Sequence, residues 1–151
     1  MINYSSFTCS HCAKFYTTTF KKIKENYIDT NMIYYIYRDV YYDESGFLSS
    51  MIARCNNNNE TFWKICYDLY ETQKTWVRGD VRKNLVNIGN KYMDKQQIDE
   101  CINNENNRNL LEWYRKNIEK HKINSTPSFI INDKYYSNMD YEEFTSILDQ
   151  I

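Results

Sequence analysis

Glycine and proline are scarce in this sequence. Its 151 residues include three glycines and one proline. This bias resembles genome-wide drift and says little about function. It does make each retained glycine or proline worth inspecting for a backbone requirement.

Long apolar runs and an excess of one charge are also missing. The longest apolar run covers 32–37, far short of the roughly 20 residues that a membrane helix needs. The chain has 19 lysines and arginines and 20 aspartates and glutamates, which leaves a formal charge of -1. The sequence has neither a basic face for phosphate backbones nor an acidic tail. These absences predict no membrane span and no nucleic-acid partner.

A secretory signal is not visible either. The residues before Cys9 contain no charged segment followed by an apolar one. The five cysteines nevertheless suit an oxidising compartment better than the cytosol, and an odd number leaves at least one cysteine unpaired. We therefore expect a processed or truncated form of a periplasmic or otherwise exported protein.

The bulk composition is that of one folded domain. Hydrophobic residues make up 42% and charged residues 26% of the chain, which is too apolar for a disordered protein. A chain of this length has room for a core and a modest insertion. A second independent domain is not expected.

The first third of the chain predicts a strand, a helix and a second strand. Met1–Tyr4 is expected to be the tail of a strand, and an amphipathic helix follows from Cys12. Its apolar positions are Tyr16, Phe20, Ile23 and Tyr27. Met32–Tyr37 is apolar throughout, which predicts a strand buried on both faces and therefore parallel to its neighbour.

The middle of the chain, from about Ser45 to His121, is predicted to be helical. Apolar residues recur there at helical spacing in five segments. Gly89 is expected to close the third helix as a C-terminal cap, and Asp94 with Gln97 forms a capping box that opens the fourth.

The last part returns to strands and ends in a helix. Ser125–Ile131 is predicted to be a strand, and Asn132–Lys134 a tight turn into Tyr135–Tyr136. Asp140 with Glu143 forms a second capping box before the final helix. The predicted order is β-α-β, a helical block, then β-β-α.

The clearest chemical signal is Cys9-Ser10-His11-Cys12 at the start of the first helix. This spacing puts both sulfurs on one face, within reach of a disulfide. The helix dipole, unpaired amides and a positively polarised His11 would stabilise a thiolate on the first sulfur. Thiolates are the attacking and leaving species of disulfide exchange.

Two alternatives to a redox pair remain open for this motif. Half of a zinc site is the main competitor, but zinc needs four ligands and the sequence has no second Cys-x-x-Cys. A merely structural pair is the other. We favour a redox pair, with no metal.

Thr126-Pro127 strengthens that interpretation. The only proline of the chain lies at the entry to a strand, where proline removes a ladder hydrogen bond. A cis peptide bond would explain its position, whereas a trans proline that begins an edge strand is the alternative.

Taken together, these segments resemble the DsbA family of thiol–disulfide oxidoreductases. Ser6-Phe7-Thr8-Cys9-Ser10-His11-Cys12, a helical insertion and Asn124-Ser125-Thr126-Pro127-Ser128-Phe129 carry the resemblance, which extends over essentially the whole chain. It implies an α/β, thioredoxin-like fold interrupted by an all-helical insertion. We expect the thioredoxin-like domain at 1–44 and 107–151, with its first strand truncated, and the insertion, as a lid over the active-site edge, at 45–106.

The resemblance also implies roles for individual residues. Cys9 would be the exposed nucleophile and Cys12 its buried partner. Independently of the resemblance, Ser10 and His11 between them are the candidate thiolate-stabilising residues. Thr126 and cis-Pro127 would form the wall against which a substrate peptide docks. Ser10 stands where family members usually have proline, so the redox potential is open.

Three cysteines remain. Ala53-Arg54-Cys55 and Ile98-Asp99-Glu100-Cys101 resemble an alpha-proteobacterial type of DsbA with a second, structural disulfide, which implies a Cys55–Cys101 bridge. Two buried free thiols are the alternative. Cys66 lies on an apolar helical face and is expected to be core.

His121, at a helix end, is expected to cap carbonyl groups. A Cys9/His121 hydrolase would need an oriented third group that the sequence does not reveal.

The predicted function is therefore that of an oxidase that introduces disulfides into secreted or periplasmic proteins by dithiol–disulfide exchange, without a cofactor. Its implied partners are unfolded or reduced substrate proteins and a membrane quinone-linked reoxidase resembling DsbB. A reductase or isomerase with the same residues, and a non-catalytic peptide-binding module, are the alternatives.

Overall fold

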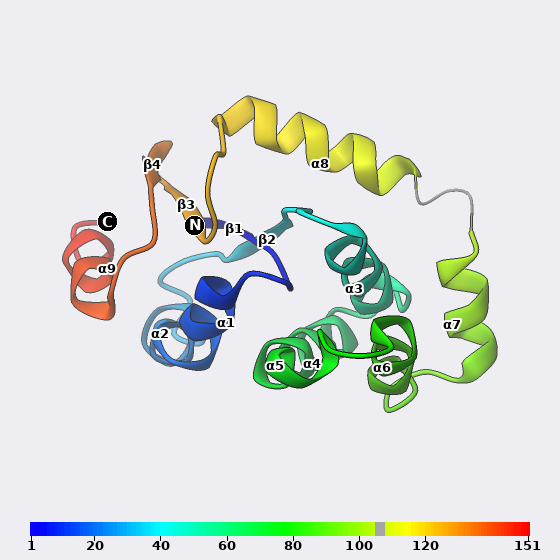
Figure 1. The fold of residues 1–151 in the computed structure, drawn as a ribbon. Helices are drawn as coiled ribbons and strands as arrows, with labels where there is room; N and C mark the ends of the chain where they lie inside the picture. The colour runs from blue at the N-terminus through cyan, green and yellow to red at the C-terminus, as the bar shows by residue number, and fades with distance from the viewer. Residues whose placement is uncertain (105–107) are drawn as a thin grey trace.

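The protein, described from a computed structural model over residues 1–104 and 108–151, is built on a four-stranded sheet (Figure 1). Its strands are β1 (Ile2–Ser5), β2 (Ile36–Asp39), β3 (Ser128–Ile131) and β4 (Lys134–Tyr136). They lie in the order β2-β1-β3-β4. β1 pairs with β2 in parallel, and β3 is antiparallel to both β1 and β4.

The helical elements surround this sheet. They are α1 (Ser10–Thr17), α2 (Thr19–Ile23), the π-helix η1 (Lys24–Ile28), α3 (Glu44–Arg54), α4 (Asn59–Glu71), α5 (Gln73–Trp76), α6 (Val81–Gly89), α7 (Lys95–Ile102), α8 (Arg108–His121) and α9 (Tyr141–Leu148). The predicted order of elements is thus confirmed, and the fold is thioredoxin-like with a long helical segment between β2 and β3. None of the helices described is long and apolar enough to cross a membrane.

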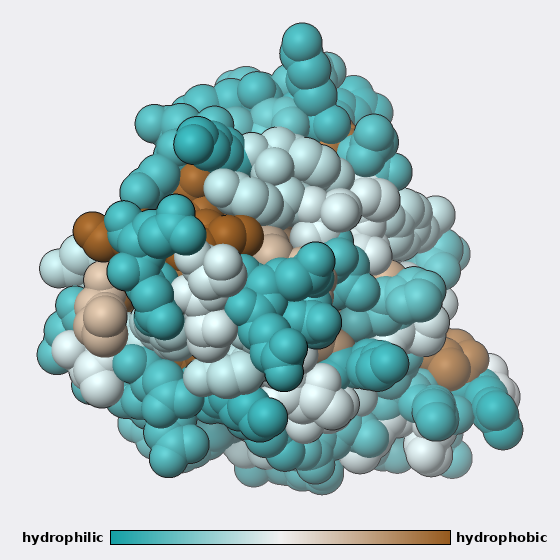
Figure 2. Space-filling model, turned by 90° about the vertical axis from the view of Figure 1, so that its left-hand side faces the viewer, coloured by the Kyte–Doolittle hydropathy of each residue, from teal (hydrophilic) through white to brown (hydrophobic). Residues whose placement is uncertain are grey.

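The two faces of the sheet have different neighbours. Alternate side chains of a strand point to opposite faces, so Phe129 and Ile131 join the main core, whereas Tyr4 and Ile130 belong to a second, smaller cluster that α8 helps to cover. Figure 1 shows α8 on one side of the sheet and α1 on the other. The face of the molecule in Figure 2 is mostly hydrophilic, with apolar residues in small separate patches.

The second strand differs from its prediction. It is parallel to β1 as expected, but it begins at Ile36 rather than Met32. The prediction of burial on both faces is wrong, because Ile36 at the start of β2 is 42% exposed, and Met32 and Tyr34 before it are 58% and 89% exposed.

The first predicted helix is divided. Its apolar positions are buried as expected, but the chain breaks at Thr18, where φ -120 and ψ -77 are not helical. α1 ends there and α2 begins, and η1 then widens the last turns. α5 was not predicted, and its Trp76 is buried in the core.

Gly89 does not cap its helix in the way the sequence suggests. It is the last residue of α6, and Asn90 after it keeps helical angles rather than a left-handed turn. A Cβ at Gly89 would lie 2.9 Å from Cδ1 of Ile98 and 3.2 Å from Cγ2 of Ile52. The glycine therefore serves close packing of α6 against α7 and α3.

The last part of the fold follows its prediction closely. Asn132 and Asp133 both have positive φ, as a tight hairpin turn requires, and β4 follows. Both predicted capping boxes form, with Asp94 and Asp140 as the N-cap residues. β3 begins at Ser128, after Pro127.

Candidate active site

The Cys-x-x-Cys motif lies where β1 passes into α1. Cys9 is the N-cap of α1, and its sulfur accepts a hydrogen bond of 3.4 Å from the backbone amide of Cys12. The amide is one of those that a helix start leaves without a helical partner. Both thiols are free, with Cys9 half-buried and Cys12 fully buried.

The two sulfurs have opposite ionisation behaviour. Hydrogen bonds from the Cys12 thiol, the Thr126 side chain and the backbone amides of Cys12 and His11 lower the pKa of Cys9 to about 5, although burial opposes them. Burial, followed by the hydrogen bond to Cys9 and the negative charge there, raises the pKa of Cys12 well above the ordinary value. At neutral pH, Cys9 is a thiolate and Cys12 a thiol.

Thr126 and Pro127 lie beside this pair. The peptide bond between them is cis. The carbonyl oxygen of Thr126 lies 3.5 Å from the Cys9 sulfur and accepts a hydrogen bond from its thiol form. Thr126 is half-buried and Pro127 is buried, and it is Thr126 that contacts the sulfur.

Ser10 and His11 occupy the exposed first turn of α1. The backbone amide of His11 contributes to the low pKa of Cys9. The sequence pointed to the imidazole of His11, and its role stays a prediction.

Gly46 lets the start of α3 approach the loop that leads to Cys9. A Cβ there would lie 3.3 Å from Oδ1 of Asp43, 3.4 Å from Oγ1 of Thr8 and 3.5 Å from Oγ of Ser6. Its position near a helix start gave no sign of this contact.

Two further residues of the site were missed by sequence reasoning. Gln73 of α5 donates from Nε2 to the carbonyl oxygens of Phe7, at 2.7 Å, and Cys9, at 2.9 Å. The Tyr42 hydroxyl lies 3.0 Å from Oγ1 of Thr126. These contacts join residues far apart in the chain, and no local spacing could have indicated them.

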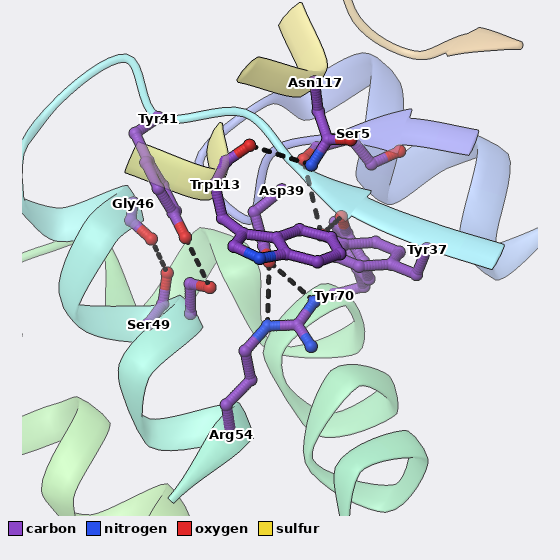
Figure 3. Close-up of polar contacts among 11 residues, drawn as sticks. Ser5, Tyr37, Asp39, Tyr41, Gly46, Ser49, Arg54, Tyr70, Trp113 and Asn117 are labelled. Carbon is purple, nitrogen blue, oxygen red and sulfur yellow. Dashed lines mark hydrogen bonds and ion pairs between the residues drawn. The ribbon is translucent and has the colours of Figure 1, made fainter. Parts of the chain in front are cut away.

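The remaining cysteines divide as predicted. Cys55 and Cys101 form a disulfide with a Cα–Cα distance of 5.5 Å, which links the end of α3 to α7. Beside it, Arg54 forms an ion pair of 2.6 Å with Asp39 of β2 (Figure 3). Cys66 is fully buried, and burial raises its pKa well above the ordinary value.

His121 pairs with Tyr4 rather than with one of the sulfurs. Its Nδ1 shares a hydrogen bond with the Tyr4 hydroxyl, where α8 covers the second cluster. Within 1–104 and 108–151, no group of three or more His, Cys, Asp or Glu side chains could hold a metal ion.

Comparisons with known proteins agree with this geometry. A family profile described as thioredoxin matches residues 1–150. A Rickettsia bellii protein named as a protein-disulfide oxidoreductase is 28% identical over 99% of this chain and 59% of its own length. Disulfide bond formation protein D of Bacillus subtilis is 22% identical over 99% of this chain and 71% of its own.

Solved structures show the same fold. Wolbachia pipientis alpha-DsbA1 superposes with a TM-score of 0.89 at 25% identity, covering 99% of this chain and 83% of that one. Bacillus subtilis BdbD superposes with a TM-score of 0.87 at 20% identity, covering 99% and 84%.

The match in sequence does not extend over the whole of the relatives. The chain spans 55% of the length of a Rickettsia conorii relative and 59% of the Rickettsia bellii protein. Because the profile matches nearly every residue, this chain belongs to the thioredoxin family, and its relatives named as disulfide oxidoreductases together with the superposition on alpha-DsbA1 make it a DsbA-family protein.

Proposed function

We propose that this protein is a thiol–disulfide oxidoreductase that introduces disulfides into reduced proteins through Cys9 and Cys12. The observation that carries the proposal is the asymmetry of the two sulfurs, with a Cys9 pKa of about 5 against a raised pKa at Cys12. A thiolate stabilised in the reduced protein makes the corresponding disulfide a good oxidant, which is the general relation between a stable reduced form and an oxidising potential in DsbA.

The first step opens the Cys9–Cys12 disulfide. A substrate thiolate attacks the half-buried Cys9 sulfur, a new bond forms between the two sulfurs, and the Cys9–Cys12 bond breaks. Cys12 leaves with the electron pair and takes up a proton, because its burial disfavours the thiolate.

The second step releases the product. A second thiolate of the substrate attacks the substrate sulfur of the mixed disulfide, and Cys9 leaves. Its low pKa makes Cys9 a good leaving group. The substrate dithiol has then lost two electrons and two protons, and the enzyme is reduced to Cys9 thiolate and Cys12 thiol, with one proton released to solvent.

Thr126 and Pro127 are proposed to hold the substrate chain. Their position beside the Cys9 sulfur supports this role. An extended substrate segment could pair there with backbone groups, as extended peptides do at other recognition sites.

The domain organisation and the environment of the protein are part of the proposal. We assign 1–44 and 107–151 to the thioredoxin-like part and 45–106 to an insertion that covers the active site; the boundary at 106/107 lies outside the described residues. The hydrogen bonds of Gln73 to the Cys9 loop support this cover.

The names of the relatives support reduced substrate proteins as the partners of this chain. The substrates follow from the name of one relative, which is called a disulfide bond formation protein. A membrane quinone-linked reoxidase resembling DsbB and a periplasmic or otherwise exported location are further parts of the proposal.

Equilibration with glutathione and turnover of a reduced, unfolded substrate protein test this function. The oxidised chain should form disulfides in that substrate, and Cys9→Ser should abolish this activity, whereas Cys66→Ser, at a buried thiol outside the site, should not. Binding of unfolded chains without exchange in the parent protein would favour the peptide-binding module. A Cys9–Cys12 disulfide that resists reduction by glutathione would favour the reductase.

A further inference from the structure

Tyr42 contacts the side-chain hydroxyl of Thr126 from the connection between β2 and α3. It is 58% exposed. Its hydroxyl oxygen is 3.0 Å from Oγ1 of Thr126, and Thr126 in turn contacts the Cys9 sulfur through its carbonyl oxygen at 3.5 Å. Tyr42 is thus one residue removed from the reacting atom.

The direction of the hydrogen bond between the two hydroxyls matters for the sulfur. Each hydroxyl has one hydrogen to donate and lone pairs to accept. If Thr126 donated to Tyr42, its only hydrogen would be used. If Tyr42 donates, the Thr126 hydrogen stays available for another acceptor, and a phenol is the more acidic and hence better donor of the two.

The Cys9 thiolate is such an acceptor. A hydrogen bond from the Thr126 side chain is among the interactions that lower the pKa of Cys9, after that of the Cys12 thiol. The same side chain also lowers the pKa of Cys12, and the backbone carbonyl of Thr126 lies 3.5 Å from the Cys9 sulfur.

On the basis of the proposed function, we propose that Tyr42 is a positioning residue whose hydroxyl donates to Thr126 Oγ1 and thereby directs the Thr126 hydroxyl hydrogen to the Cys9 sulfur. The relay runs from the Tyr42 phenol through the Thr126 hydroxyl to the sulfur. Because the sulfur is charged only in the reduced protein, the relay stabilises the reduced form over the disulfide.

The surroundings of the sulfur make such a relay measurable. The main interactions that lower the Cys9 pKa are hydrogen bonds. Tyr35 and Tyr70 interact electrostatically with Cys12, and Tyr42 interacts with both sulfurs. Loss of one donor should therefore change the Cys9 pKa.

Tyr42→Phe tests the relay, because it removes the hydroxyl and keeps the ring. Since the hydrogen bond is neutral and acts here through one intermediate group, the Cys9 pKa should rise by about half a unit. At neutral pH the equilibrium with glutathione should move about threefold towards the disulfide form. Thiolate absorbance against pH and the glutathione equilibrium measure the two effects.

Tyr41→Phe is the matched control. The Tyr41 hydroxyl is 3.2 Å from Oγ of Ser50 in α3. Removing it takes a hydroxyl from the same connection without touching Thr126. The Cys9 pKa of this variant should equal that of the parent protein.

A double-mutant cycle separates the relay from a simple change of packing. In a Thr126→Val background, Tyr42→Phe should no longer move the Cys9 pKa, whereas in Thr126→Ser, which keeps the hydroxyl, it should. An unchanged pKa in Tyr42→Phe, or an equal shift with and without the Thr126 hydroxyl, overturns the relay. The pKa is measured without a substrate, so a parent protein that exchanges no disulfides would defeat the proposed function alone.

Discussion

At the residue scale, the five cysteines differ in environment rather than in chemistry. Cys9 lies at the N-cap of α1 with hydrogen-bond donors around a half-buried sulfur. Cys12 and Cys66 are buried, and burial is the first cause of the raised pKa of each. The remaining two are joined in a disulfide. The reactivity of a thiol follows its thiolate fraction and its exposure. Among the three free cysteines, Cys9 combines a high thiolate fraction with exposure.

Alkylation of the reduced protein with iodoacetamide at mildly acidic pH should therefore label Cys9 first. Near pH 6, Cys9 is largely a thiolate because its pKa is about 5, whereas Cys12 and Cys66 are protonated and inaccessible. Peptide mapping after a short reaction locates the label, and Cys9→Ser is the control that should remain unlabelled. Labelling of Cys66 at a rate similar to that of Cys9 would contradict the assignment of the nucleophile.

At the element scale, local sequence signals predicted most of what positions the site. The Cys-x-x-Cys motif marked the start of α1 to within one residue, and both capping boxes marked helix starts. These features depend on neighbours in the sequence. The position of β2 could not be predicted in this way, since apolarity over 32–37 does not say which residues pair with β1.

Contacts between residues far apart in the chain could not be predicted from local sequence signals either. Tyr42 reaches Thr126 over a separation of 84 residues, and Gln73 reaches Cys9 over 64. The chain has 15 tyrosines, and nothing in the sequence distinguishes Tyr42 from the others. The resemblance to DsbA predicted the cis bond and the second disulfide, which the residue pattern alone left open.

The Cys55–Cys101 disulfide gives a prediction at this scale. It closes a segment of sequence separation 46 between α3 and α7. On the chain-entropy account of disulfides, a loop of this size lowers the stability of the unfolded chain enough to contribute about 4 kcal/mol to folding. Cys55→Ala with Cys101→Ala should lower the free energy of unfolding in urea by up to this amount.

Cys66→Ala is the comparison for that experiment, because it also removes a sulfur from the helical segment but breaks no bridge. Its loss should be that of a small core truncation, roughly 1–2 kcal/mol. A double variant as stable as the protein with the bridge would show that the unfolded chain is not constrained by it.

At the scale of the whole molecule, the active-site redox state and folding stability are linked. Cys9 titrates only in the reduced protein, so its low pKa adds stability to the reduced fold and none to the oxidised fold. Cys66 and the groups away from the site titrate in both forms, so their contributions cancel in the difference between the two stabilities. That difference isolates the active site.

The sign of this difference against pH is the last prediction. The folded pKa of Cys9, about 5, lies below the ordinary value of about 8.5 for an unfolded thiol. A depressed pKa gives stability that is present above the unfolded value and is lost as pH falls through the folded value. From pH 5 to pH 8, the stability of the reduced protein relative to the oxidised protein should therefore rise.

The slope is at most about 1.4 kcal/mol per pH unit for one proton, and solvent at the half-exposed sulfur makes the total gain smaller. Above about pH 8.5 the buried Cys12 thiol opposes a further rise, because its pKa is raised in the folded state.

Urea denaturation of both redox forms at several pH values measures the difference. The pH-independent part contains the loop entropy of the Cys9–Cys12 bridge, so the slope rather than the offset is diagnostic. Cys9→Ala, which has no thiolate, should lose the rise relative to the oxidised parent protein, and a flat difference in the parent protein itself would contradict a thiolate-stabilised reduced state.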